Sequence, residues 1–357
     1  MNPTRFGIVG GGWRSLFYLR IARELPERFE VGGVVVRDSA KGGMLEATWG
    51  VKTYRTLDDL LRVSGLDFVV VSVPWPVTPQ VLFALADRSI PALAETPPAP
   101  DLPSLIALNE LIQQRARVQV AEQYHLQPLL AAQLAVVQSG KLGTVTQAQV
   151  SVAHGYHGIS LIRKFLGITF EPVAITAQRI ISPLIAGPDR GGPPIHEHTT
   201  SSQQVIAHLD FGDKLGIYDF TDDQYFSWIR SSRLLTRGDR GEIINSRVRY
   251  LADFRTPITI DLMRQDAGEE GNLEGYYHKG ILSGGEWVYQ NPFAPARLSD
   301  DEIAIATCLS KMQIYVEGGP DFYSLAEAAQ DHYLNIMIER ALTSDSMVKT
   351  TLQSWAE

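Results

Sequence analysis

Histidine and tyrosine side chains cluster at two places in the chain where they can move a proton. His154-Gly155-Tyr156-His157 forms one cluster, and Tyr124-His125 forms the other. Histidine titrates near neutral pH, and a tyrosine hydroxyl can hydrogen-bond beside it, so the combination suits general acid–base catalysis. The alternative is that these side chains are packing residues whose hydrogen bonds are satisfied inside the fold.

A run of glycines, Gly10-Gly11-Gly12, lies between the first apolar segment and the first amphipathic one. In dinucleotide-binding turns the first glycine allows a tight turn and the second lets the backbone approach the pyrophosphate. Gly10 and Gly12 occupy those two places, whereas Ser15 stands at the place of the third glycine, where we expect it only to loosen packing. The N-terminus of the next helix offers free N–H groups to the anion. The segment predicts a dinucleotide site, and a plain strand-to-helix turn is the alternative.

The end of the second predicted strand, Val36-Arg37-Asp38, bears on the choice of cofactor. An acidic residue there binds the adenine ribose of NAD, but Val36 occupies its place. Arg37 can pair with the 2′-phosphate of NADP, and Asp38 can instead bind the ribose. The segment favours NADP over NAD, with a solvated Arg37 as the alternative.

Two histidine pairs have spacings that could bind a metal ion. His154 and His157 are three residues apart, and His196 and His198 are two apart. Neither pair brings a third ligand, and Cys308 is the only cysteine, which excludes a cysteine-based zinc site. We therefore predict no metal site.

The first 122 residues alternate apolar strands with amphipathic helices, which predicts a parallel sheet covered on both faces. The right-handed crossover rule makes this a doubly wound Rossmann sheet. The predicted strands are 6–10, 31–36, 67–73, 91–94 and 118–121, and the helices are 16–25, 57–63, 77–86 and 102–115.

From residue 123 onward the chain is richer in β-branched and aromatic residues, with turn signals between them. This pattern predicts an α+β domain, residues 123–357, with an open, mostly antiparallel sheet. The segment 186–194 is rich in glycine and proline and predicts a loop. The aromatic segment 225–230 suits either a substrate pocket or an oligomer contact. The predicted strands are 145–152, 174–181, 205–211, 215–220 and 232–236, and the helices are 126–137 and 323–342.

Composition narrows the class of partner. The 357 residues carry a net charge of −8, and no basic run offers a surface for nucleic acid. The N-terminus enters a strand pattern without an apolar leader, and no stretch is apolar enough to span a membrane. We expect a cytoplasmic protein that binds a small molecule.

These features together resemble the glucose–fructose oxidoreductase/inositol dehydrogenase/MocA (Gfo/Idh/MocA) family. The family has a strand followed by proline, then a helix, then a strand ending in Glu-Lys-Pro; here Pro74 and Glu95-Thr96-Pro97 hold those places. His157, Ser160, Arg163 and Gly167 fall in the frame of a family helix, and 323–328 resembles the entry to the last helix. The resemblance implies a Rossmann domain and a substrate domain whose sheet often serves oligomerisation.

The chain departs from the family at polar catalytic places. The family lysine that faces the reacting oxygen is Thr96 here, and threonine neither carries a proton near neutral pH nor supplies a positive charge. The family aspartates before and after the histidine are Ala153 and Ser160. The usual alcohol-oxidation mechanism therefore does not transfer unchanged, and we expect Arg163 to be a structural ion-pair partner.

From the residues and the resemblance we predict a site at the junction of the two domains. His157 is the predicted acid–base, helped by Tyr156 or Tyr124. Arg14, at the start of the first helix, either contacts the pyrophosphate or substrate or is a surface residue. The predicted cofactor contacts are Gly10, Gly12, Trp13, Arg14, Arg37, Asp38, Ser72, Pro74, Glu95 and Gln123.

The function predicted first is an NAD(P)-dependent oxidoreductase acting on a small polar metabolite: a sugar, a cyclic polyol or a related carbonyl or imine. The loss of the lysine keeps two alternatives open. One is a catalytically silent dinucleotide-binding sensor or partner protein. The other is a lyase or hydrolase that uses bound NAD in a redox-neutral cycle. We expect a homo-oligomer, a dimer or tetramer, formed through the C-terminal sheet.

Overall fold

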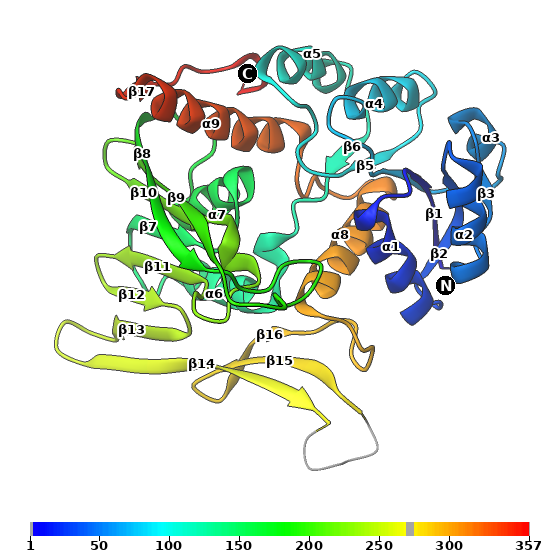
Figure 1. The fold of residues 1–357 in the computed structure, drawn as a ribbon. Helices are drawn as coiled ribbons and strands as arrows, with labels where there is room; N and C mark the ends of the chain where they lie inside the picture. Colours follow the sequence, from blue (N-terminus) through cyan, green and yellow to red (C-terminus); the bar gives the residue numbers. More distant parts are fainter. Residues whose placement is uncertain (1–2, 269–274, 357) are drawn as a thin grey trace.

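The computed structural model describes residues 3–268 and 275–356, and its first 120 residues build a six-stranded sheet (Figure 1). All neighbouring strands are parallel, in the order β3-β2-β1-β4-β5-β6. This is the doubly wound order, in which ligands bind beyond the carboxyl ends of β1 and β4, where the strand order reverses. The predicted Rossmann sheet is confirmed. Its elements are β1 (Thr4–Val9), α1 (Trp13–Glu24), β2 (Phe29–Val35), α2 (Ser39–Trp49), β3 (Thr53–Tyr54), α3 (Leu57–Leu61), β4 (Phe68–Val71), α4 (Thr78–Ala86), β5 (Ala92–Ala94), α5 (Leu102–Gln113) and β6 (Val118–Val120).

The rest of the chain builds an eleven-stranded sheet in the order β16-β15-β14-β13-β12-β11-β7-β10-β9-β8-β17. Only β7 and β10 pair in parallel among the described neighbours, so the predicted mostly antiparallel sheet is confirmed. Its strands are β7 (Val145–Ser151), β8 (Ala174–Ile185), β9 (Thr199–Asp210), β10 (Leu215–Thr221), β11 (Arg233–Gly238), β12 (Gly241–Ile244), β13 (Arg247–Leu251), β14 (Pro257–Ala267), β15 (Tyr277–Ser283), β16 (Glu286–Gln290) and β17 (Val348–Lys349).

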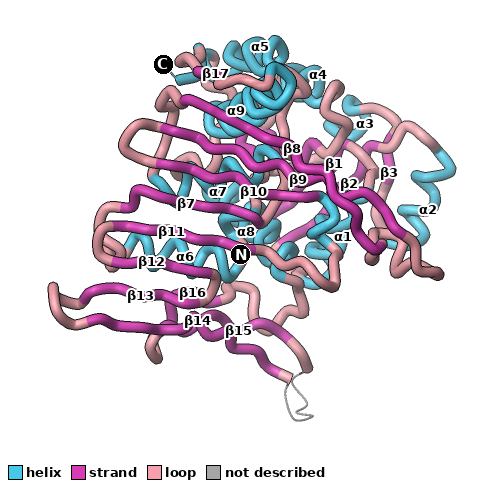
Figure 2. Tube along the Cα trace, turned by 60° about the vertical axis from the view of Figure 1, so that its left-hand side comes forward, coloured by secondary structure: helices cyan, strands magenta, loops and turns pink. Residues whose placement is uncertain are grey.

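The helices of this half lie on one face of its sheet and leave the other face open (Figure 2). Helix α7 packs on β7 and β10, and α9 packs on β8. The loop predicted at 186–194 connects β8 to β9. The helical elements are η1 (Tyr124–Leu126), α6 (Pro128–Gln138), α7 (Gly155–Leu166), η2 (Asp222–Tyr225), α8 (Asp300–Val316), α9 (Leu325–Ser344) and η4 (Ser354–Ala356).

Helix α8 lies beside α1, although it comes late in the chain (Figure 1). Its buried Ile303, Cys308 and Leu309 share a core cluster with Phe6 and Ile8 of β1. The core of the first sheet is therefore completed by a helix from beyond residue 122. The division at that residue stays a prediction: it separates the strands of the two sheets but not the helices that cover them.

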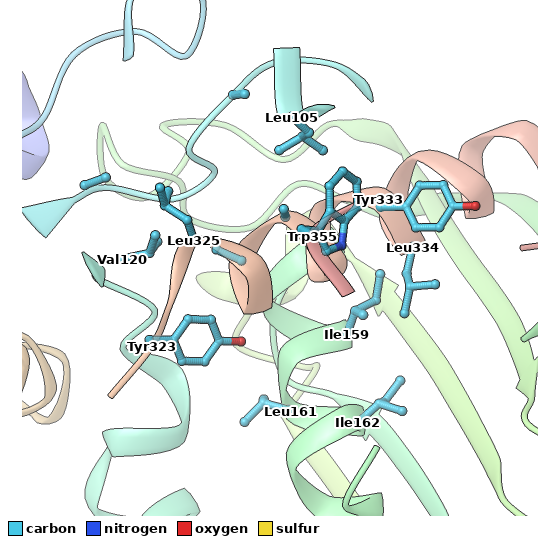
Figure 3. Close-up of a cluster of buried hydrophobic side chains, with 14 of the residues drawn as sticks. Leu105, Val120, Ile159, Leu161, Ile162, Tyr323, Leu325, Tyr333, Leu334 and Trp355 are labelled. Carbon is cyan, nitrogen blue, oxygen red and sulfur yellow. The ribbon is translucent and has the colours of Figure 1, made fainter. Parts of the chain in front are cut away.

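A second hydrophobic cluster joins the two halves and fixes α7 against the first sheet (Figure 3). Ile159 and Ile162 of α7 are fully buried, together with Leu334 of α9. The same cluster includes Leu105 of α5 and Val120 of β6, which belong to the first half. Because the buried side chains span both halves, the first turn of α7 keeps a fixed place relative to the ends of the parallel strands.

A buried ion pair adds to this junction. Arg163 of α7 donates to the Asp331 carboxylate of α9, and both side chains are almost fully buried. The same guanidinium donates to the main-chain oxygens of Thr169 and Glu327. The expectation that Arg163 is a structural ion-pair partner is confirmed.

Replacing Asp331 by asparagine should lower the free energy of unfolding by about 3–5 kcal/mol, because Arg163 would stay buried without its counter-charge. The matched control is Glu339→Gln, which breaks the solvent-exposed pair between Glu339 and Arg179 and should change stability by about 0–1 kcal/mol. Urea unfolding of the two variants measures the difference. Equal losses of stability would contradict the structural role of the buried pair.

Candidate active site

A cavity of about 790 Å³ runs along the carboxyl ends of the parallel strands to the first turn of α7. It begins at the glycine turn after β1, passes the ends of β2, β4 and β5, and ends at His154 and His157, at the start of α7. The predicted residues that line it are Gly10, Gly12, Trp13, Arg14, Arg37, Asp38, Ser72, Pro74, Glu95, Tyr156 and His157. Gln123 and Tyr124 do not line it. Gln123 lies behind Arg14, and Tyr124 lies behind His157.

The glycine turn has the geometry that a bound phosphate needs. Gly10 has φ +115°, and a Cβ there would lie 1.9 Å from the main-chain oxygen of Ser72. Gly12 caps α1, and a Cβ there would meet no described atom within 4 Å. The Ser15 hydroxyl donates to the Gly10 oxygen at 2.9 Å, so this serine ties the turn together, contrary to the expectation that it only loosens packing. The open N-terminus of α1 fits a pyrophosphate.

Trp13 forms the rim of the cavity and is 52% exposed. The guanidinium of Arg190, from the loop between β8 and β9, lies 4.5 Å from the centre of its indole ring. The Arg14 guanidinium is 5.5 Å from the same ring. The long β8–β9 hairpin of the second sheet thus reaches the glycine turn of the first.

Cations gather where β2 ends. Arg37, Lys41 and Arg55 line the cavity there, and none of the three forms a salt bridge with a described carboxylate. Asp38 caps α2 by accepting from the Lys41 main-chain N–H at 2.8 Å. Arg55 donates to the Val36 main-chain oxygen at 3.1 Å, which holds it at this end. The arrangement offers positive charge to an anion, while Asp38, which lines this end of the cavity, is tied to a helix cap.

Arg14 is held by carboxylates rather than lying free on the surface. It lies 3.2 Å from Asp301 of α8 and 3.4 Å from Glu95, which also accepts from Tyr18. Burial disfavours its charge, but Glu95 and Asp301 outweigh that effect and raise the pKa of Arg14. With its amide oriented to satisfy both of its polar atoms, Gln123 accepts from Arg14 at 2.8 Å. Gln123 therefore supports Arg14 and is not a wall of the cavity.

His157 is paired with a buried carboxyl group. Its Nδ1 lies 2.6 Å from Oε2 of Glu122, and the two side chains are 4% and 1% exposed. Burial is the main cause that lowers the pKa of His157, to about 3, with Arg14 acting in the same direction. Burial also raises the pKa of Glu122, to about 8, although the Tyr124 main-chain N–H and Arg14 oppose the shift. Because Nδ1 is engaged, Nε2 is the nitrogen left for a molecule in the cavity.

Aromatic side chains surround His157. The rings of Tyr156 and Tyr124 are each centred 4.5 Å from its ring, and that of His154 is centred 5.0 Å away. The Tyr156 hydroxyl donates to the main-chain oxygen of Thr96 at 3.4 Å. Both predicted helper tyrosines thus lie beside His157, although only Tyr156 reaches the cavity.

Tyr225 links this cluster to the second sheet. Its hydroxyl lies 2.6 Å from His154 Nδ1 and 3.4 Å from the Tyr124 hydroxyl. Tyr225 thus joins the aromatic segment 225–230 to this cluster without lining the cavity, and Trp228 and Ile229 of the same segment are more exposed than Tyr225. Burial raises the pKa of Tyr225, as it does for Tyr156.

The other histidines that were considered as metal ligands do not join the site. His196 and His198 are exposed residues before β9 and do not line the cavity. Among residues 3–268 and 275–356, no three His, Cys, Asp or Glu side chains are grouped so that they could hold a metal ion.

Several site residues escaped the sequence-based prediction. Glu122 and Asp301 act through partners that are distant in the chain. Trp75 lines the cavity beside Tyr156, and Lys41 and Arg55 line its far end. The position of Glu122 at the end of the last parallel strand was the one available signal, since such ends meet at the ligand-binding edge.

The parallel sheet, the open glycine turn and the cavity at the strand ends are those of an NAD-binding Rossmann fold, to which a second, mostly antiparallel sheet is joined. Residues 4–124 match the model of the Gfo/Idh/MocA oxidoreductase family, described as an NAD-binding Rossmann fold. These residues belong to that family, and the resemblance predicted from the sequence is confirmed.

Curated relatives match at low identity. The chain is 22% identical over 190 residues to inositol 2-dehydrogenase of Corynebacterium glutamicum strain R, over 51% of this chain and 56% of that protein. It is 27% identical over 109 residues to inositol 2-dehydrogenase of Leifsonia xyli, over 30% of this chain and 32% of that protein. The chain thus spans about half the length, or less, of the curated relatives it matches.

Solved structures match over the whole chain. A levoglucosan dehydrogenase in complex with NADH has a TM-score of 0.70 at 14% identity, covering 99% of this chain and 100% of that one. An NAD-binding oxidoreductase from Klebsiella pneumoniae has a TM-score of 0.68 at 15% identity, covering 98% and 99%. At such identities the likeness establishes the fold. Within the described residues, no helix has the length and apolar character needed to cross a membrane.

Proposed function

We propose that this chain is an NAD(P)-dependent oxidoreductase that acts on a small polar metabolite, a sugar, a cyclic polyol or a related carbonyl or imine compound. The observation that carries the proposal is the single cavity that connects the open glycine turn with His157. Proteins similar to this chain are named inositol 2-dehydrogenase and levoglucosan dehydrogenase, in agreement with this class of substrate.

The residues of the glycine turn fit a dinucleotide. The N–H groups at the start of α1 would hold the pyrophosphate, beside Trp13 and Arg14. Ser72 and Pro74 after β4, and Glu95 after β5, would border the nicotinamide half. When bound, the nicotinamide accepts or supplies the hydride.

His157 is the proposed acid–base. Its free Nε2 would accept the proton of a substrate hydroxyl in the oxidising direction and return it in the reducing direction. Tyr156 lies beside it at the cavity and can orient the same substrate oxygen, while Tyr124 packs against its other side. Thr96 lines the cavity but cannot take over the proton transfer.

The end of β2 supports NADP(H) as the preferred cofactor. Arg37, Lys41 and Arg55 line this end without salt bridges to described carboxylates, and a 2′-phosphate would supply the missing negative charge. Asp38, which could otherwise bind the ribose hydroxyls, accepts from the main chain of α2.

Replacing Arg37 by serine should weaken NADPH binding about 10- to 100-fold and leave NADH binding nearly unchanged, because a charge-assisted hydrogen bond contributes about 1.5–3 kcal/mol. Arg62→Ser, at an exposed arginine directly after α3, is the matched control and should change neither affinity. Fluorescence titration of the unchanged protein and both variants with NADPH and with NADH gives the dissociation constants to compare. Tighter binding of NADH than of NADPH to the unchanged protein would contradict the NADP preference.

The reaction itself is tested with a panel of sugars, polyols and imines, followed by nicotinamide absorbance and by product analysis. A lasting absorbance change with one of them is the expected result. Tight cofactor binding without any product would favour the silent sensor or partner protein. Product without a net absorbance change would favour the redox-neutral lyase or hydrolase. Either of these outcomes would overturn the proposal.

We also propose that copies of the chain associate through the open face of the second sheet. Ile180 of β8, Ile244 of β12 and Met263 of β14 expose large apolar side chains on this face, which favours their burial in an interface. Light scattering of the purified protein should give the mass of a dimer or tetramer, and a monomer would contradict this proposal.

A further inference from the structure

Glu122 is a buried carboxyl group for which the proposed acid–base role of His157 gives no function. It is the last residue of the predicted first domain, two positions after β6, and lies 35 positions before its partner. Its Oε2 is 2.6 Å from His157 Nδ1, and its Oε1 accepts from the Tyr124 main-chain N–H at 3.1 Å. A carboxyl group that is 1% exposed is costly to keep unless a specific interaction requires it.

We infer that Glu122 is a positioning and proton-storing residue that makes one dyad with His157, and that this dyad replaces the lysine absent at Thr96. The inference rests on the proposed oxidoreductase function, because it assigns how the acid–base of that reaction handles its proton. Glu122 acts through His157 and does not line the cavity.

The proton transfer involves three groups: the substrate hydroxyl, the His157 imidazole and the Glu122 carboxyl group. In the oxidising direction the substrate O–H bond breaks and a bond from that hydrogen to His157 Nε2 forms. The Nδ1–H bond breaks, and an O–H bond to Glu122 forms. The imidazole ends neutral with its hydrogen moved from Nδ1 to Nε2, and Glu122 ends as the acid. The reducing direction reverses each step.

Burial explains why the proton would move on to Glu122. An imidazolium at this depth is disfavoured, and the pKa of His157 is lowered accordingly, to about 3. The same burial raises the pKa of Glu122 to about 8, so the carboxyl group holds the proton at neutral pH. Both shifts favour neutral forms, and a tautomer switch of His157 keeps both side chains neutral after the transfer.

Charges from several elements face the dyad and partly cancel. Arg14 favours the carboxylate form of Glu122, whereas Asp301 opposes it. The titratable or charged groups around the pair are Arg14 of α1, Asp301 and Cys308 of α8, Lys164 of α7, Tyr124 of η1, Tyr225 of η2, Asp331 of α9 and Tyr323 just before it, with His154 and Tyr156 beside the imidazole.

The sign of the pH dependence follows from the raised pKa of Glu122. The dyad accepts a proton only when Glu122 is a carboxylate, so oxidation should rise as pH increases through about 8. Reduction needs the protonated dyad and should fall over the same interval. Glu122→Gln removes the titrating group, so the inflection should disappear in both directions.

Nitrogen-15 NMR of the histidine side chains tests the dyad without substrate or cofactor. In the unchanged protein, His157 should carry its hydrogen on Nδ1 above pH of about 8 and on Nε2 below it. In Glu122→Gln the tautomer should not change with pH, and Glu122→Asp should restore a switch. The His157 signals are assigned by their loss in His157→Ala.

Kinetics gives the second readout. Glu122→Gln should lower kcat about 10- to 100-fold with little change in KM or in dinucleotide affinity. Asp331→Asn, which removes another buried carboxylate, should keep a pH inflection because Glu122 and His157 both remain, even where it lowers stability. The dyad would be overturned if the His157 tautomer did not change with pH in the unchanged protein. It would also be overturned if the pH inflection of the rate remained in Glu122→Gln. Full turnover by His157→Ala would instead refute the proposed acid–base.

Discussion

Replacing His157 by alanine should lower kcat by about 10²- to 10⁴-fold, the range that a positioned general acid–base supplies. Its imidazole lines the cavity with Nδ1 held by Glu122, which leaves Nε2 for proton transfer. Dinucleotide affinity should stay within about twofold, because His157 lies at the opposite end of the cavity from the glycine turn. Steady-state rates and a cofactor titration on the same preparation measure both effects.

A second buried histidine provides the matched control. His278 of β15 is fully buried and lies 2.8 Å from the Asp266 carboxylate, but it does not line the cavity. His278→Ala removes a histidine–carboxylate pair of the same kind and should cost stability without removing turnover. If the two alanine variants lose activity to the same extent, the loss follows from unfolding, and His157 has no special role.

Substituting the two glycines of the turn should separate folding from binding. In Gly12→Ala the methyl group meets no described atom within 4 Å, so the free energy of unfolding should change little. The methyl group would stand where the pyrophosphate approaches the backbone, and we expect dinucleotide affinity to fall at least about 10-fold, or 1.4 kcal/mol.

Gly10→Ala should act on the fold itself. Its Cβ would lie 1.9 Å from the Ser72 main-chain oxygen, and its φ of +115° is strained for any side chain. The cost should exceed about 1–3 kcal/mol, since the oxygen belongs to the backbone of the neighbouring strand end and cannot rotate away. Thermal unfolding and cofactor titration of both variants give the comparison. Unchanged affinity in Gly12→Ala would place the dinucleotide elsewhere.

The parallel half of the fold was predictable because its strands are short, apolar and bounded by amphipathic helices. The strand predicted at 31–36 is β2 (Phe29–Val35), and the helix predicted at 102–115 is α5 (Leu102–Gln113). Helix α2 was missed, since Gly42 and Gly43 weaken its helical pattern and its stability depends on the Asp38 cap. Helix α8 was also missed, although Ser299 and Glu302 form a capping box at its start.

Site residues could be predicted where a residue type suited to the chemistry stands at a recognisable place in the sequence pattern, as at Gly10, Arg37 and His157. Its long-range partners were not. Asp301 reaches Arg14 across 287 positions, and no local pattern encodes that contact. Glu122 lies two positions before Tyr124, but its contact with His157 depends on the packing of α7 against the strand ends. A hydrophobic core that spans both halves determines that packing.

The most direct test of the account is calorimetric titration of the purified, folded chain with NADPH and with NADH. We predict saturable binding of one dinucleotide per chain for at least one of the two, abolished or strongly weakened by Gly12→Ala. A folded protein that takes up neither dinucleotide would contradict the assignment of the cavity, and with it the roles given to His157 and Glu122.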